Sequence, residues 1–263
     1  MALYDGTGRQ SSSILYSILK NERADRHEPH HVGAAVRPAA CSCVSEPRAA
    51  LRCPQVTSTA ASAVLLKTLK FVKNVPCFRE LPPGDQLLLV RGGWAQLLVL
   101  GMAQDGLDFD TTEGAERSLL QSILTGAPGR SRCSRQAERA GAPVAEIRAI
   151  KGVLRRCWAL HVSTKEYAYL KGAVLFSPDL EGLQCRRHIE GLQREAHRAL
   201  HQHVRTARRE EGARFAKLLS ALCTLRRVSA SAVAELFLRP VMGPVDMEQL
   251  LGEMLHGKEK QEG

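Results

Sequence analysis

One apolar stretch constrains the fold of this chain more than any other feature. Residues 83–102 read PGDQLLLVRGGWAQLLVLGM, and a proline is well tolerated in the first turn of a helix. The stretch is apolar around most of its circumference, which is typical of a helix that is buried on nearly all sides. Because such a helix needs partners on both flanks, we expect one domain that spans residues 1–257.

Three segments outside the periodic stretches complete the expected domain organisation. Residues 23–56 are rich in His, Pro, Ala and Arg and show no apolar period, and residues 125–143 are loaded with Gly, Arg and Ser. Both segments are predicted to be flexible loops, and residues 258–263 are predicted to form a short charged tail. A division into two domains at 126–143 is the alternative.

The apolar residues favour helix over strand. Leu and Ala supply most of the 44% hydrophobic fraction, and both have high helix propensity, whereas β-branched residues in two-residue alternation are scarce. We therefore predict an all-α fold. Ser163 and Glu166 have the spacing of a capping box. Apolar residues at helical spacing predict helices at 11–21, 61–75, 83–102, 118–124, 144–160, 167–176, 183–204, 215–225, 229–238 and 246–256.

The charge and the cysteines limit the compartment and the partners. The net charge is +10, but the basic residues at 130–139 and 186–209 are not interleaved with aromatic side chains that stack on bases. We therefore expect a basic, soluble surface and no direct DNA binding, with nucleic-acid binding by residues 186–209 as the rival. Eight irregularly spaced cysteines favour a reducing, intracellular compartment. Neither an apolar signal region nor a continuous run of roughly 18 apolar residues is found, so we expect no membrane association.

Residue patterns that carry catalysis or metal binding do not stand out. Cys41, Cys43 and Cys53 lack the paired CxxC spacing of zinc sites. His197 and His201 share a helix face without the acidic residue of an HExxH motif. The sequence has no GxSxG elbow, no phosphate-binding glycine loop and no nucleotide fingerprint. We predict a protein without catalytic residues, metal or cofactor, and therefore not an enzyme.

Two short leucine motifs indicate a binding function instead. Both have the form LxxIL, and their apolar residues are Leu15, Ile18 and Leu19 in the first copy and Leu120, Ile123 and Leu124 in the second. On a helix, positions i, i+3 and i+4 form one compact apolar knob, which is the shape that fills a shallow hydrophobic groove. Ordinary packing in the protein's own core is the alternative for both motifs.

A longer pattern, F-x-K-x4-F-x2-L-x3-D-Q, runs through residues 71–86, and its fixed positions are Phe71, Lys73, Phe78, Leu81, Asp85 and Gln86. It closely resembles the signature of nuclear-receptor ligand-binding domains. Residues 166–179 resemble the mid-domain helix and turn of that fold, and residues 250–255 resemble its terminal activation helix. No cysteine array precedes the domain, so the chain is similar to the small group of orphan receptors that lack the zinc-bearing DNA-binding domain.

The resemblance implies a fold and a cleft. The fold is a three-layer antiparallel sandwich of about a dozen helices, with a groove that receives LxxLL helices. Because helix ends expose unpaired N–H and C=O groups, a lysine and a glutamate can hold opposite ends of a bound helix, and the resemblance assigns Lys73 and Glu253 to this charge clamp. Arg91 stands where relatives often have an acidic residue. The groove would be lined by Leu69, Gln86, Leu87, Val90 and Met254.

The implied function is transcriptional repression without chemistry. The chain would insert its LxxIL helices into the clefts of other nuclear receptors and displace coactivators. It would then recruit corepressors such as histone deacetylase complexes, in the nucleus and also in the cytoplasm. Residues 251–255, LGEML, are themselves LxxLL-like and able to occupy the chain's own groove. The alternative function is a receptor domain that senses a small lipophilic molecule, for which the sequence assigns no polar anchor.

Overall fold

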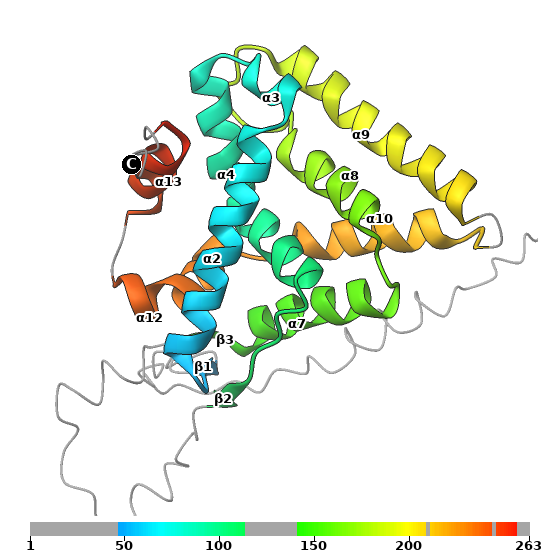
Figure 1. Cartoon of the computed structure of the whole chain (residues 1–263). Coiled ribbons are helices and arrows are strands. Elements are labelled where there is room, and N and C mark those ends of the chain that lie inside the picture. Colours follow the sequence, from blue (N-terminus) through cyan, green and yellow to red (C-terminus); the bar gives the residue numbers. More distant parts are fainter. Residues whose placement is uncertain (1–46, 114–140, 209–210, 244–245, 257–263) are drawn as a thin grey trace, which may run out of the picture. The chain divides into compact units, whose positions relative to one another are not determined.

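The computed structural model describes residues 47–113, 141–208, 211–243 and 246–256. Most of these residues are helical, which confirms the predicted helical sandwich (Figure 1). Three short strands accompany the helices, namely β1 (Arg48–Leu51), β2 (Thr111–Glu113) and β3 (Ala142–Pro143). The helices are α2 (Pro54–Lys73), α3 (Pro76–Arg79), α4 (Pro83–Gln104), α7 (Val144–Ala159), α8 (Thr164–Leu175), α9 (Arg186–Ala207), α10 (Arg214–Leu225), α11 (Ala230–Val233), the π-helix η1 (Ala234–Leu238), α12 (Arg239–Met242) and α13 (Met247–His256).

Helix α4 is the central element of the described fold. It packs against α2, α7 and α8. Gly101 lets α2 approach closely, because a Cβ at this position would lie 2.6 Å from Val64 Cγ1 and 2.7 Å from Thr68 Oγ1. By length and composition α4 could cross a membrane, but 67% of its apolar window is buried inside the fold, as the sequence predicts for a core helix. Its fully buried large side chains are Leu89, Leu97, Leu98, Leu100 and Met102.

The three strands form a small antiparallel sheet in the order β2-β1-β3. Ala49 of β1 pairs with Ala142 of β3. Gly141 has a φ of +101° and approaches the Ala49 carbonyl so closely that a Cβ would collide with it, so only glycine fits there. The prediction of loops at 23–56 and 125–143 is therefore wrong for β1, for β3 and for the first residues of α2. Strand pairing joins segments far apart in the chain and leaves no local period.

Two helices differ most from their predicted limits. Helix α2 begins at Pro54, whereas the apolar period predicts a start at Ala61. A proline at the first helical position starts a helix without any apolar signal. The helix predicted at 229–238 is divided into α11 and η1, and α12 follows it. Pro240 lies in the first turn of α12 and lacks the N–H that a continuing α-helix would use, and a π-turn accommodates this change of pitch.

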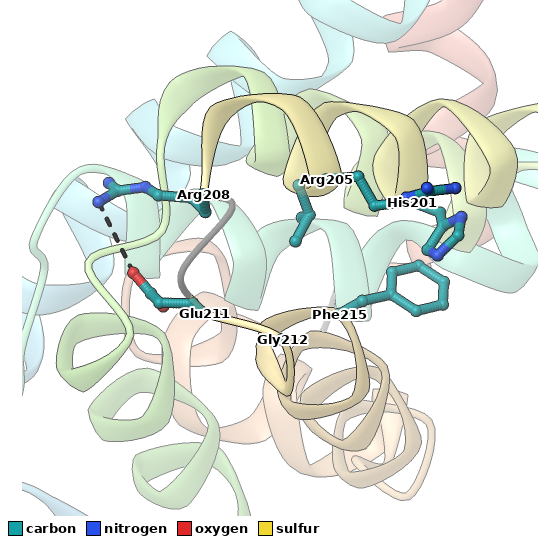
Figure 2. Close-up of a pocket in the computed structure, with 7 residues that line it drawn as sticks. His201, Arg205, Arg208, Glu211, Gly212 and Phe215 are labelled. Carbon is teal, nitrogen blue, oxygen red and sulfur yellow. Dashed lines mark ion pairs between the residues drawn. The ribbon is translucent and has the colours of Figure 1, made fainter.

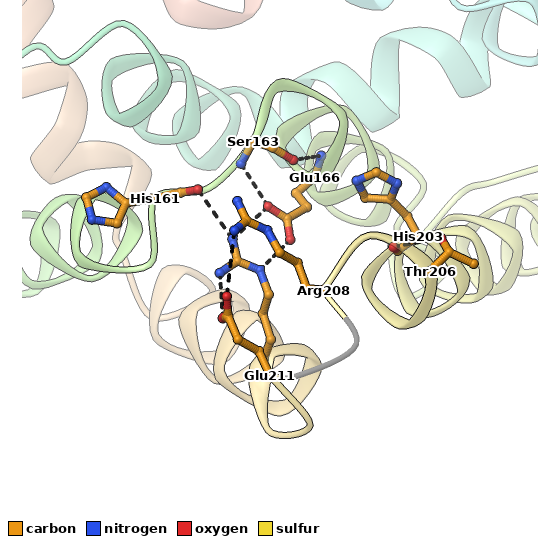
Figure 3. Close-up of polar contacts among 8 residues, drawn as sticks. His161, Ser163, Glu166, His203, Thr206, Arg208 and Glu211 are labelled. Carbon is orange, nitrogen blue, oxygen red and sulfur yellow. Dashed lines mark hydrogen bonds and ion pairs between the residues drawn. The ribbon is translucent and has the colours of Figure 1, made fainter.

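The junction of α8 and α10 is held by a buried ion pair (Figure 3). The Glu166 carboxylate accepts hydrogen bonds from Arg214 Nε at 2.6 Å and Nη2 at 2.9 Å, and the two side chains are 1% and 3% exposed. Glu166 and Ser163 also form the predicted capping box, which is confirmed. Burial alone would raise the pKa of Glu166, but the hydrogen bonds from Arg214 and Ser163 outweigh it and lower the pKa to about 2.

Candidate functional site

The candidate cleft is formed by α2, α4 and α13. Helix α13 packs against both α4 and α2, and α3 with its flanking turns joins the end of α2 to the start of α4 (Figure 1). Gln86 fastens the turn between α3 and α4, because its Nε2 donates a hydrogen bond to the Leu81 carbonyl at 2.8 Å and to the Arg79 carbonyl at 3.3 Å. The site therefore combines an early part of the described chain with its last helix.

The apolar face of α13 points into the fold. Leu251, Met254 and Leu255 share this face at positions i, i+3 and i+4. Leu251 and Leu255 are buried, and Met254 is half-buried against the core. Gly252 faces α4, because a Cβ at this position would lie 4.0 Å from Leu87 Cδ1. The LxxLL-like segment of this chain therefore packs on α4 and α2, where the resemblance places the groove. Burial of each large side chain is worth roughly 1.5–3 kcal/mol.

One ion pair holds α13 from the solvent side. Arg91 Nη1 of α4 lies 3.3 Å from Glu248 Oε2 of α13, and the two side chains are 34% and 69% exposed. An exposed pair of this kind contributes about 0–1 kcal/mol. Arg91, which replaces the acidic residue expected from the resemblance, thus has a partner within the chain. Glu248 was not identified from the sequence as the partner of Arg91. The only hint in the sequence is the basic residue at position 91, where relatives often have an acidic one.

The predicted lining residues lie at different depths. Leu69 and Val90 are 3% and 0% exposed, so they form the floor beneath the cleft rather than its surface. Leu87 and Met254 are half-buried where α4 and α13 meet. Gln86 is half-exposed, and its amide is occupied by the turn that it fastens. The structure therefore brings Leu87 close to α13 and places Leu69 and Val90 in the core.

The two residues of the predicted charge clamp lie on elements that border the cleft. Lys73 is the last residue of α2 and is half-buried, whereas Glu253 is exposed on α13 and accepts a hydrogen bond from Gln249 Nε2 at 2.8 Å. Among the described residues they do not pair with each other. Two charges that hold opposite ends of one helix must indeed stay apart. Their role as a clamp stays a prediction.

The LxxIL motifs lie outside the described residues, so the description of the site does not include them. Their apolar positions are Leu15, Ile18, Leu19, Leu120, Ile123 and Leu124. The assignment of these residues as receptor-binding groups rests on sequence alone and stays a prediction. Interaction measurements with variants of both motifs are the direct way to test it.

Most residues of the family signature build the fold rather than the surface of the cleft. Asp85 is fully buried, and its carboxylate accepts 2.8 Å hydrogen bonds from the N–H groups of Gln184 and Cys185 at the start of α9. The Phe71 ring packs beneath the Lys171 ammonium, which lies 5.5 Å from the ring centroid. Burial lowers the pKa of Lys171. The signature therefore ties α2, α4, α8 and α9 together.

The chemistry of the described residues favours binding over catalysis. Burial raises the pKa of Cys77 on α3, and it raises the pKa of Cys157 on α7 to about 11. Both thiols therefore stay protonated near neutral pH, and a protonated thiol is a poor nucleophile. In the part of the chain that the structure describes, no group of three or more His, Cys, Asp or Glu side chains is placed to hold a metal ion.

Comparison with known proteins identifies the family. The model of the ligand-binding domain of nuclear hormone receptors matches residues 55–241. The chain is 49% identical over 247 residues to nuclear receptor subfamily 0 group B member 1 of Sus scrofa, which covers 87% of this chain and 52% of the relative. The protein of the same name from Callithrix jacchus is 44% identical over 272 residues, covering 94% of this chain and 55% of the relative. The Homo sapiens protein is 47% identical over 228 residues, covering 78% and 47%.

The matched residues contain most of the candidate cleft, since α4 and nearly all of α2 lie within them. The chain spans about half the length of the curated relatives it matches. Nuclear receptors form a family of transcription regulators that are not enzymes and that are generally nuclear. Through its ligand-binding domain, the chain belongs to the nuclear hormone receptor family.

Proposed function

We propose that this chain is a transcriptional corepressor that works by binding other nuclear receptors. It inserts its LxxIL helices into their clefts, displaces coactivators and recruits corepressors, including histone deacetylase complexes. It acts in the nucleus, with a further pool in the cytoplasm, and it needs neither a cofactor nor a chemical step. Family membership supports the proposal, as does an identity of 44% to 49% with relatives of one receptor subfamily.

One observation supports the proposal: helix α13 packs against α4 and α2, where the family resemblance places the cleft. An outside LxxLL helix would have to displace Leu251 and Leu255, which are both buried. Their exposure would cost roughly 3–6 kcal/mol in total. A chain whose own cleft is filled is better suited to offer helices to other receptors than to receive them.

The predicted charge clamp fits a second step of the same function. If α13 shifts without leaving the edge of the cleft, Lys73 on α2 and Glu253 on α13 would hold opposite ends of a helix from a repressive partner. Leu87 and Met254 would contact that helix directly, because both are already half-buried at the surface of the cleft. The fully buried lining residues would support them from below.

The test is a calorimetric measurement of binding between the full chain and ligand-binding domains of other nuclear receptors. The double variant Leu19→Ala, Leu124→Ala removes one apolar anchor from each motif and should weaken binding by about a hundredfold or more. Leu66→Ala is the matched control, because Leu66 on α2 is 49% exposed, and it should change the affinity by less than about twofold. Full-strength binding by the double variant would contradict the proposal.

The alternative, a receptor domain that senses a small lipophilic molecule, has less support. Ligand sites are usually enclosed apolar cavities. Two hollows in the described residues instead lie at the surface, along α9. Large side chains of α4 and α7 such as Leu98, Met102 and Ile150 are fully buried in the interior. A thermal-shift screen with lipophilic acids and sterols would reverse this preference if one compound raised the melting temperature in proportion to its concentration.

A further inference from the structure

Helix α9 has two faces of different chemistry. Its inner face carries the buried Ile189, Leu200 and Val204, which pack towards α8 and α10. Its outer face carries basic residues at spacings of three and four, which places them in one stripe along the helix. We define this basic stripe as Arg194, Arg198, His201, Arg205 and Arg208, all of them exposed.

The arginines of the basic stripe differ in how far their charge is neutralised. Arg194 lies 3.3 Å from Glu190, and Arg198 lies 2.5 Å from Glu195. Arg205 has no ion pair within the part of the chain that the structure describes. Arg208 lies 3.8 Å from Glu211. Arg205 is therefore the arginine of the stripe whose charge no acidic side chain of the described residues neutralises.

A hollow of about 170 Å³ opens at the C-terminal end of α9, between α9 and α10 (Figure 2). Its floor is apolar, because Val204 and Phe215 line it, and the His201 ring packs against the Phe215 ring with centroids 4.8 Å apart. Arg205 and Arg208 also line it. Figure 2 shows His201 and Phe215 at one end of the hollow and Arg208 at the other. A second, open depression continues along α9 and shares His201 and Arg205 with the first.

The size and lining of the hollow restrict its occupant. Pockets for drug-sized ligands usually measure roughly 300–1,000 Å³, so 170 Å³ has room for little more than one bulky side chain. The apolar floor suits an aliphatic or aromatic group. Arg205 at the rim suits a carboxylate beside that group, whereas Arg208 is already paired with Glu211. We propose that this surface binds a short acidic segment of a partner protein that inserts one large apolar side chain into the hollow.

Two other occupants match the surface less well. A nucleic acid would place phosphates along the whole basic stripe, where Glu190, Glu195 and Glu211 interrupt the positive charge. A second copy of the chain would set the basic stripe against itself, and like charges repel across an interface.

The test uses a fluorescent synthetic peptide in which a single leucine is flanked on both sides by aspartate and glutamate. Its binding to the full chain is followed by fluorescence anisotropy. Arg205→Glu should weaken binding by about tenfold, because it reverses the charge at the rim of the hollow. Arg227→Glu makes the same change in net charge at an exposed position after α10 and should change the affinity by less than about twofold.

A second peptide, in which serine replaces the leucine, tests the hollow without any change in the protein, and it should also bind about tenfold more weakly. Equal binding of the two peptides, or equal losses in the two arginine variants, would overturn the proposal. So would a DNA duplex that displaces the peptide and binds more tightly at the same ionic strength. Leu19→Ala, Leu124→Ala should bind the peptide normally, which separates this inference from the proposed corepressor function.

Discussion

Two helix contacts in this fold are held by opposite means. Helix α8 is joined to α10 by the buried pair of Glu166 and Arg214, whereas α13 is joined to α4 by apolar contacts and the exposed pair of Arg91 and Glu248. Breaking a buried pair is costly because it strands one charge in the interior, while an exposed pair is worth little. The junction of α8 and α10 should therefore be a permanent part of the fold, and we expect α13 to be held more weakly.

The largest expected effect is the loss of the buried pair. Arg214→Met leaves the Glu166 carboxylate buried without its cation and should lower the free energy of unfolding by about 3–5 kcal/mol, as measured by chemical denaturation. Arg208→Met is the matched control, because it removes an exposed arginine that lies 3.8 Å from Glu211. The control should change the free energy of unfolding by less than about 0.5 kcal/mol. Equal losses of unfolding free energy in the two variants would show that the burial of the Glu166–Arg214 pair is not the cause of the destabilisation.

The same pair predicts a specific response to acid. Folding lowers the pKa of Glu166 from 4.5 to about 2, so the unfolded chain takes up the proton more readily than the folded chain. The stabilisation is fully present above about pH 4.5 and is lost, to the extent of about 3 kcal/mol, as the pH falls to about 2. The free energy of unfolding, measured by denaturation at several pH values in this interval, should fall less steeply with decreasing pH in Glu166→Gln than in the unmodified chain. An equally steep fall in both proteins would assign the loss of stability in acid to other carboxylates.

A smaller effect on global stability is expected at α13. Leu251→Ala removes a buried side chain, which costs about 2–5 kcal/mol in a core. Because α13 is a terminal helix, we expect this change to weaken the docking of α13 on the fold more than the stability of the fold as a whole. Hydrogen exchange of the α13 amides should accelerate by about thirtyfold or more while α4 stays protected, and an LxxLL peptide should bind the cleft more tightly. Gln249→Ala, at an exposed position, is the control. If Leu251→Ala lowered the free energy of unfolding without faster exchange in α13, the result would show that α13 unfolds only together with the rest of the fold.

The smallest effect is expected at the exposed pair. Arg91→Glu sets two negative charges side by side and should weaken the docking of α13 by about 0–1 kcal/mol, visible as exchange up to about fivefold faster in α13. The reversed pair, Arg91→Glu with Glu248→Arg, should restore the original protection. Failure of the double variant to restore it would mean that the two side chains do not meet in solution.

The local features of this fold are readable from the sequence because they depend on neighbours along the chain. The apolar circumference of residues 83–102 predicts the burial of α4, and the spacing of Ser163 and Glu166 predicts the cap of α8; both predictions are confirmed. Helix faces and caps are decided within one or two turns. The family signature is readable for a related reason, since Asp85 and its neighbours hold fixed structural positions.

The features that involve distant segments are not readable in this way. The pairing of β1 with β3 joins residues that the apolar pattern assigns to separate loops. The depth of Leu69 and Val90 depends on how α2 and α4 pack against each other and against the other helices. The partner of Arg91 is known only when α13 lies against α4.

By itself, the sequence determined the family pattern, the central apolar helix and the LxxLL-like face of residues 251–255. Only the tertiary structure decided that this face is buried against α4 and α2, and that a basic stripe on α9 ends at a hollow lined by Val204 and Phe215. The physical reason is one of range. Periodicity and capping are set by residues a few positions apart, whereas an apolar face or an unpaired charge acquires a particular partner only when the folded chain brings one within contact distance.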